Sequence, residues 1–194
     1  MEFRAVVRRR RMVRSASPEP VEQEQVRRIL HTALRGPSAG FSQGQSFVVV
    51  SDPELRARVA ELAGEPAYRA RGYPAWISAA PVLIVCCTSQ EAYDRRYAQA
   101  DKAGSGHPDW PVPYRYVDAG CALMLLLLAA VDEGLAAGFL GIHRVPGLRD
   151  LLGIPAAVEP IGVVTLGHPA PDRPSSSLRR ARRPDSEVIH RDRW

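Results

Sequence analysis

The sequence predicts one domain of the α+β or α/β class, and three observations support this. The chain has 194 residues, of which 45% are hydrophobic, enough for one sizeable core but not for two independent domains. Four short apolar runs, typical of buried strands, are interspersed with helical patterns at a spacing that is not a regular βαβ series. No Gly-x-Gly-x-x-Gly follows a predicted strand, so a Rossmann dinucleotide-binding domain is not supported.

The first part of the chain is expected to be helical. Residues 1–14 carry Phe3, Val6, Val7 and Val13 near one helical stripe, and Arg10 falls on the same stripe. Two prolines between residues 15 and 20 break this helix. A second helix is predicted over residues 21–34, and Gly36 and Pro37 are expected to end it.

The middle of the chain alternates strands and helices. A loop over residues 38–45 leads into a strand at 47–50, and Asp52 and Pro53 then begin another helix. Residues 80–87 (APVLIVCC) contain no alternating polar positions, so both faces of this strand are expected to be covered. Residues 89–116 are polar, aromatic and irregular, and a connection of this length is usually functional or disordered.

The last elements follow one apolar helix. This helix is predicted over residues 117–133, with a strand at 137–142, a brief helix at 148–152 and a fourth strand at 158–166. From about residue 168 to residue 194 the chain is rich in Pro, Ser and Arg, and we expect an extended arm.

Composition favours a protein of the cytoplasm. The longest apolar run, 121–131, is shorter than the roughly 20 residues of a membrane-spanning helix, and no signal-peptide pattern follows the basic N-terminus. The three cysteines show neither a disulfide framework nor metal-ligand spacing. The sequence therefore predicts reduced thiols, no membrane partner and no metal.

The net charge of +5 comes from arginines that gather near both chain ends. A solvated basic tail or a nucleic-acid patch is one interpretation of Arg8 to Arg11. However, an arginine among valines on a core-facing stripe needs an anion, because a buried unpaired cation costs several kcal/mol. A phosphate satisfies Arg10, and Arg14, one helical turn away, could reach the same ligand.

Six segments together resemble the nitroreductase superfamily of FMN flavoproteins over nearly the whole chain. They are RRMVRSASPEPV (10–21), ILHTALRGPSAGFSQGQSFVVV (29–50), DAGCALMLLLLAAVDEGL (118–135), FLGIH (139–143), PIGVVTLGHPA (160–170) and RARRPDSEVIH (180–190). The resemblance implies a central, mostly antiparallel sheet flanked by helices and one FMN-binding domain over residues 1–194. It also implies an intertwined homodimer in which the arm, about 168–194, packs on the partner subunit.

The resemblance implies a role for each matching residue. Arg10, Arg11 and Met12 match the positions that hold the FMN phosphate and ribityl chain, and Arg14 matches a cation near the edge of the flavin ring, where positive charge eases reduction. The loop that contacts FMN from the partner subunit is matched by Pro37, Ser38, Ala39, Phe41 and Gln43. Backbone that lines the flavin face is matched by Leu140 and Gly141, and the basic pair that closes on the phosphate is matched by Arg180 and Arg182.

The family implies an NADH- or NADPH-dependent oxidoreductase. NAD(P)H gives a hydride to FMN in a ping-pong cycle, and an electron-poor small molecule such as a nitroaromatic or a quinone then takes two electrons. No catalytic side chain is required, because the flavin is the reactive group. Tyr97, Trp110 and Tyr114 are expected to form a substrate-side wall, with aromatics packed inward on a surface flap as the alternative.

Departures from the family pattern leave other functions open. Met12 replaces a frequent serine, Phe41 a frequent asparagine, and Gly44 and Gln45 a common Pro-Trp, so the ring environment and the substrate can differ. The alternatives are a specialised flavin dehydrogenase or oxidase of the same fold, a flavin- or deazaflavin-binding protein without NAD(P)H turnover, and a nucleic-acid-binding protein using its arginine clusters.

Overall fold

One antiparallel sheet organises the molecule in the computed structural model, which describes residues 1–105, 107, 110–172 and 179–194. Its strands are β1 (Gln45–Val50), β2 (Val82–Thr88), β3 (Ala136–Gly141) and β4 (Glu159–Gly167). The order in the sheet is β1-β2-β4-β3, and every neighbouring pair is antiparallel. The predicted α+β class with an antiparallel sheet is confirmed, and β1 and β3 are its two edges.

The central strand β2 is buried on both faces, as its continuous apolar sequence predicts. Ile84 and Cys86 join the core on one face, whereas Leu83 and Val85 join the core on the other, because successive side chains of a strand point to opposite faces. Burial raises the pKa of the Cys86 thiol to about 12, so this thiol stays protonated and acts as a small apolar side chain.

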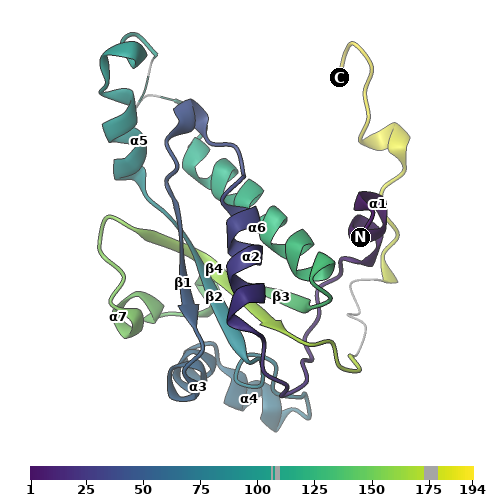
Figure 1. Ribbon diagram of the computed structural model, residues 1–194. Coiled ribbons are helices and arrows are strands. Elements are labelled where there is room, and N and C mark those ends of the chain that lie inside the picture. Colours follow the sequence, from purple (N-terminus) through teal and green to yellow (C-terminus); the bar gives the residue numbers. More distant parts are fainter. Residues whose placement is uncertain (106, 108–109, 173–178) are drawn as a thin grey trace.

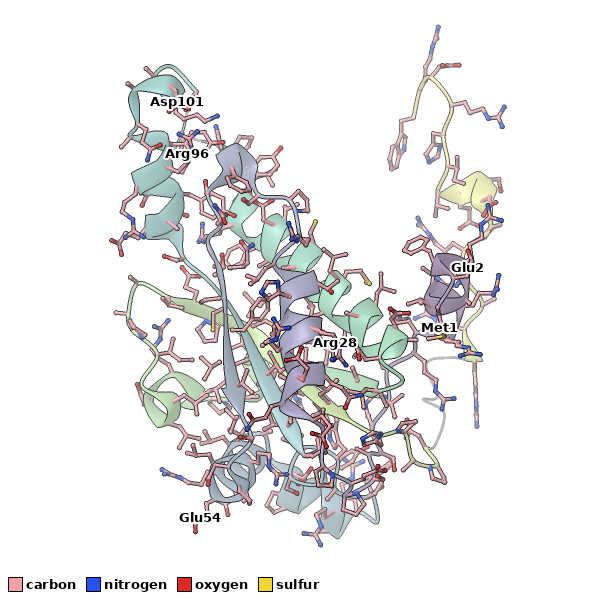
Figure 2. All side chains as sticks on the ribbon, viewed as in Figure 1. Met1, Glu2, Arg28, Glu54, Arg96 and Asp101 are labelled. Atoms are coloured by element: carbon pink, nitrogen blue, oxygen red, sulfur yellow. The ribbon has the colours of Figure 1, made fainter. Side chains whose placement is uncertain are left out.

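Two helices cover the first face of the sheet, α2 (Gln23–Ala33) and α6 (Tyr114–Asp132), which cross in front of it in Figure 1. A capping box at Glu22 begins α2, since its carboxylate accepts from the backbone of Gln25 while the Gln25 side chain accepts from the backbone of Glu22. On the outer side of α2, Arg28 forms a two-pronged ion pair with Glu133 at the end of α6, with nitrogen to oxygen distances of 2.8 and 2.7 Å (Figure 2). The ion pair thus links the outer side of α2 to the end of α6.

The second face is covered by α3 (Pro53–Leu62), α7 (Leu148–Leu152) and the segment before β2. Asp52 begins α3 by accepting a hydrogen bond of 2.8 Å from the backbone of Leu55, as the Asp-Pro pair predicts. The other helices are α1 (Phe3–Arg9), α4 (Glu65–Ala70) and α5 (Gln90–Tyr97), and the short 3₁₀ turns are η1 (Ala39–Phe41), η2 (Ala100–Lys102), η3 (Ile142–Arg144) and η5 (Asp185–Glu187).

A buried carboxylate shapes the segment before β2. Glu65, 3% exposed, accepts backbone hydrogen bonds from Trp76 at 2.7 Å, Ile77 at 2.6 Å and Ser78 at 3.2 Å, as well as one from the Ser78 hydroxyl. Buried charge is tolerated only where hydrogen bonds replace water in this way. Glu65 therefore fixes the backbone that carries Trp76.

We expect Glu65→Ala to lower the free energy of unfolding by about 3 kcal/mol or more, because several buried donors then lose their acceptor. Urea denaturation at one fixed protein concentration measures the change. Glu61→Ala, on an exposed position of α3, is the matched control and is expected to change it by less than about 0.5 kcal/mol. Equal effects for the two variants would contradict this role of Glu65.

The predicted helix over residues 1–14 is wrong beyond residue 9. α1 ends at Arg9, and the chain then runs alongside the free edge of β3, where the backbone N–H of Val13 donates to Ala137 at 3.0 Å. Ala16 then forms an isolated antiparallel bridge with Pro169, just after β4. Hydrogen bonds to an open sheet edge outweigh the helical pattern here. Arg10 and Arg14 are consequently separated along an extended segment and do not lie one helical turn apart.

Two other expectations are corrected. The stretch before β2 contains α4, and the irregular segment 89–116 begins with α5 and ends in the first turn of α6, which starts at Tyr114 and not near residue 117. Propensity signals for α4 and α5 are weak, since these helices have six and eight residues and carry few apolar positions. Their tertiary contacts, described below for α5, hold them in place.

By length and composition, α6 is one helix in the described ranges that could cross a membrane, with 19 residues and a mean hydropathy of 1.6. It packs against α2 and β2, and its buried residues include Ala122, Leu126 and Ala130. We therefore interpret it as a core helix.

Candidate functional site

The N-terminal arginines border an open depression at the carboxyl end of α6. Arg8, Arg9 and Arg11 line this depression of about 520 Å³. Its apolar side is formed by residues of the N-terminal segment, the end of α6 and the start of β3: Val13, Val131, Leu135, Ala136 and Ala137. The site thus combines a cationic rim with an apolar wall, as an anionic ligand with a flat hydrophobic part requires.

These arginines are available to an anion. Within residues 1–105, 107, 110–172 and 179–194, no acidic side chain forms an ion pair with Arg8, Arg9, Arg10 or Arg11. Elsewhere in the described chain, arginines such as Arg28 and Arg96 do find carboxylates. Arg11 is exposed and lines the depression, whereas Arg10, half-buried next to it, caps α1 through its backbone N–H and is not one of the lining residues. The donor set fits a phosphate group, which would supply the negatively charged partner that these guanidinium groups lack.

Arg14 lies further along the same extended segment and is held on two sides. Its backbone N–H donates to the Asp172 carboxylate at 2.9 Å, and its guanidinium lies over the ring of Trp76, 5.7 Å from the centroid. Trp76 is itself fixed by Glu65, so Arg14 rests on a rigid support. The edge of the guanidinium remains available for hydrogen bonds while its face covers the indole.

Leu140 and Gly141 form the end of β3, on the same sheet edge that the N-terminal segment follows. Both are half-buried. Gly138, two residues earlier, has no room for a side chain, since a Cβ there would lie 2.5 Å from the carbonyl oxygen of Val13. This close approach brings the arginine-bearing segment against β3.

The predicted loop at residues 37–43 has a constrained backbone. Gly40, Phe41 and Gln43 have φ angles of 60°, 58° and 50°, which is uncommon for the last two residue types. The Ser38 hydroxyl accepts from the backbone of Gln43 at 3.0 Å. Phe41 is 73% exposed and Pro37 is also exposed, so the loop presents its outer side to solvent in a single chain. Backbone strain of this kind is often found where a loop contacts a ligand.

The structure places the two predicted groups at opposite ends of α6. The backbone N–H of Ala39 donates to Asp118, near the start of α6, whereas Arg8 and Arg11 lie beside Val131, near its end. The distance along the helix is about 20 Å, at 1.5 Å per residue. Figure 1 shows α1 and the loop at β1 at different ends of α6. One chain therefore does not bring Arg10 and Arg11 together with Ser38 and Ala39.

The flap, defined as α5 and the described residues between it and α6, contains the predicted substrate wall. Trp110 lies edge-on to Tyr97 and Tyr114, with ring centroids 4.6 and 5.4 Å apart, and the His107 ring lies 5.0 Å from that of Tyr97, tilted by 30°. Arg96 pairs with Asp101 at 2.7 Å at the tip (Figure 2). The structure thus brings Tyr97, Trp110 and Tyr114 together, packed on each other as on an inward-facing flap.

The cavity beside these rings is small. It has a volume of about 120 Å³ and is lined by residues that include Tyr93, Trp110 and Arg115. Pockets for small organic ligands are usually about 300 Å³ or larger. Stacking of a substrate on these rings stays a prediction, and in this conformation it requires an outer ring face such as that of Tyr114, which is 43% exposed.

The C-terminal arm is exposed over its described part. Arg180 and Arg182 extend into solvent, and no described side chain pairs with them. Val188, Ile189 and Trp194 are 44%, 61% and 101% exposed. The arm thus presents apolar side chains that another surface can cover.

Sequence reasoning missed two residues that shape the site, namely Trp76 and Asp118. A carboxylate inside an apolar helix was a usable signal for Asp118, because buried carboxylates need a specific partner. Nothing in the sequence around Trp76 pointed to Arg14, 62 positions away, and only the fold reveals that contact.

Comparison with known proteins identifies this type of α+β fold. The nitroreductase family matches residues 7–168 of the chain. A putative NADH dehydrogenase/NAD(P)H nitroreductase of Methanothermobacter thermautotrophicus is 30% identical over 100% of this chain and 88% of its own length, and an FMN reductase [NAD(P)H] of Bacillus subtilis is 32% identical over 95% and 71%. The solved structure of an NADPH:FMN oxidoreductase from Vibrio harveyi, complexed with NAD+, superposes with a TM-score of 0.75 at 25% identity, covering 99% of this chain and 77% of that one.

The fold defined by the sheet and its two helical layers is that of a nitroreductase-like oxidoreductase. The chain belongs to the nitroreductase family. The resemblance inferred from the six sequence segments is therefore confirmed, and so is the predicted class of enzyme.

Proposed function

We propose that this protein is an FMN-dependent oxidoreductase that uses NAD(P)H to reduce an electron-poor small molecule such as a nitroaromatic compound or a quinone. The family and the names of the relatives support FMN and NAD(P)H, as the sequence predicts. The choice of a nitroaromatic compound or a quinone as the electron acceptor is our proposal. We further propose that residues 1–194 form one FMN-binding domain and that the enzyme works in the cytoplasm.

The main structural support is the separation of the predicted site residues along α6, which indicates a site formed by two chains. Arginines suited to a phosphate lie at one end of the helix, and the constrained loop at residues 37–43 lies at the other. A second copy of the chain, related by a two-fold axis across α6, would place its loop beside the arginines of the first. Each site would then contain residues of both chains, and the homodimer would hold two sites.

An exposed apolar stripe on α6 supports this pairing. Val117 is 46% and Met124 47% exposed, and Gly120 is also exposed between them. Half-buried Cys121 and Leu128 continue the stripe at helical spacing. No charged residue interrupts it, and a Cβ at Gly120 would meet no atom within 4 Å. Such a surface is typical of a helix that packs closely against a second helix.

We propose that the C-terminal arm packs on the partner subunit. Its exposed Val188, Ile189 and Trp194 would be covered there, and Arg180 and Arg182 would approach a phosphate already held by Arg10 and Arg11. Cation pairs converging on one phosphate from different segments bind it more tightly than one segment alone.

Bound FMN supplies two-electron chemistry by accepting and releasing hydride at its ring. The residues of this chain would bind FMN, orient its ring and set the charge around it. Arg10 and Arg11 would hold the phosphate, and Arg14, supported by Trp76, would place positive charge at the ring edge and so favour the reduced state. The Leu140 and Gly141 backbone would line the ring, and the flap would limit access of water and set the shape of the acceptor site.

The absorbance of the purified protein tests this function. We expect a yellow dimer that retains FMN and that NADH or NADPH bleaches under anaerobic conditions, with colour returning on addition of a quinone. A colourless protein that does not take up added FMN contradicts the proposal. A yellow protein that NAD(P)H does not bleach indicates a carrier or a specialised enzyme instead, and binding that falls steeply with salt and shows no chromophore indicates a nucleic-acid partner.

A further inference from the structure

A buried aspartate joins three elements at the amino end of α6. Asp118 is 7% exposed, and its Oδ2 atom accepts two hydrogen bonds, from the backbone N–H of Ala39 at 2.8 Å and from the hydroxyl of Tyr93 at 2.6 Å. No lysine or arginine in the described ranges forms an ion pair with it. An unpaired buried carboxylate is unfavourable unless hydrogen bonds replace its water. One of these bonds comes from the loop, through Ala39, and the other comes from the flap, through Tyr93.

The loop needs such a contact. Three of its residues, Gly40, Phe41 and Gln43, have positive φ angles, and conformations of this kind persist only where the surroundings hold them. Ala39 immediately precedes them and is fixed by Asp118. On the far side of the loop, the Arg96 guanidinium donates to the Gly40 carbonyl at 2.7 Å. Hydrogen bonds to α6, through Asp118, and to α5, through Arg96, therefore hold the loop on two sides.

Two glycines let the flap pack directly on the loop. A Cβ at Gly40 would lie 2.7 Å from the Tyr97 hydroxyl oxygen, and a Cβ at Gly44 would lie 2.5 Å from the Tyr93 ring. Burial of Tyr93, and then its hydrogen bond to Asp118, raise the pKa of the Tyr93 hydroxyl. The hydroxyl therefore stays protonated and acts as the hydrogen-bond donor to Asp118. Loop, flap and α6 form one packed unit around Asp118.

We propose that Asp118 is a positioning residue that holds the loop at residues 38–43 in its FMN-contacting conformation and ties the flap to it through Tyr93. The inference rests on the proposed function, in which this loop contacts FMN. Movement of the flap, which carries the aromatic cluster, is then coupled to the affinity for FMN. Asp118, which is 7% exposed, would act through these two segments.

Four variants of the full chain test this role: Asp118→Ala, Asp118→Asn, Tyr93→Phe and the control Glu91→Gln. Glu91 is an acidic residue of α5 that pairs with Arg95 on the exposed side and does not contact the loop. The measurements are the dissociation constant for FMN and the hydrogen exchange of the Ala39 amide in the FMN-free protein. The second measurement does not depend on activity.

We expect Asp118→Ala to weaken FMN binding about 10- to 100-fold and to speed Ala39 exchange by a similar factor, since a hydrogen bond to a charged group is lost. Asp118→Asn is expected to retain FMN affinity within about fivefold, because its amide oxygen can accept both bonds, but to exchange Ala39 faster than the wild type. Tyr93→Phe is expected to loosen the flap, seen as faster exchange in α5, with FMN affinity reduced about two- to fivefold. Glu91→Gln is expected to match the wild type.

Failure of this inference differs from failure of the proposed function. If the wild type does not bind FMN, the proposed function is wrong, and Ala39 exchange still tests the contact of Asp118. If the wild type binds FMN while Asp118→Ala binds equally well, or leaves Ala39 protected, the positioning role is overturned. Should Asp118→Ala not fold, Asp118→Asn decides, because unchanged Ala39 exchange in that variant overturns the role.

Discussion

The double variant Arg10→Ala/Arg11→Ala is expected to weaken FMN binding by about a hundredfold or more. Each guanidinium can contribute about 1.5–3 kcal/mol through hydrogen bonds to a charged phosphate. In the described ranges neither arginine has an acidic partner whose release would complicate the comparison. Riboflavin, which lacks the phosphate, is expected to bind the variant and the wild type with affinities within about threefold of each other, because uncharged contacts to the ring remain.

Fluorescence titration with both flavins measures this effect as a change in the preference for FMN over riboflavin. Arg58→Ala/Arg69→Ala is the matched control, since it removes the same charge from exposed positions of α3 and α4. The control is expected to preserve the preference. A preference that survives loss of Arg10 and Arg11 would show that the phosphate lies elsewhere.

The variant Met124→Glu is expected to be monomeric and to lose most of its FMN. Met124 is 47% exposed at the centre of the apolar stripe of α6, so a two-fold pairing of this helix would bury the two new carboxylates against an apolar surface. An unpaired buried charge costs several kcal/mol, which is enough to dissociate a dimer at micromolar concentration. Because each site would then lack the partner's loop, FMN affinity is expected to fall at least tenfold.

Sedimentation equilibrium and FMN titration of the same sample test this expectation. Arg58→Glu is the control, because it places a new carboxylate on an exposed position of α3, a helix on the other face of the sheet. We expect that variant to remain dimeric and yellow. A wild-type chain that sediments as a monomer and still binds FMN tightly would refute the two-chain site.

Hydrophobic pattern was sufficient to locate all four strands, each within two residues of its observed bounds. The continuous apolar run that forms β2 marks a strand buried on both faces, and the structure places helices on each side of it. The prediction of helices was wrong where tertiary contacts outweighed the hydrophobic pattern. The valines of residues 1–14 have helical spacing, but Val13 instead bonds to Ala137 on the open edge of β3. α5 has little apolar surface and depends on Tyr93, whose hydroxyl is held by Asp118.

The candidate site was predicted in part. Residue types and the order of segments indicate arginines for a phosphate and a glycine-containing loop for a flat ring, because these features depend on chemistry that individual residues carry. Their relative positions depend on α6. The placement of Arg11 near one end of the helix and Ala39 near the other cannot be obtained from spacing along the chain.

The sequence by itself therefore determined the class of the protein and its strands, and it predicted the chemistry of its ligand, since apolar periodicity, arginine placement and the six ordered segments are properties of local sequence. Only the tertiary structure decided how these parts combine. Contacts between residues far apart in sequence gave Arg14 its support on Trp76 and joined the loop to the flap through Asp118. They also separated the two halves of the site along α6, because a rigid helix fixes the distance between the segments packed at its ends.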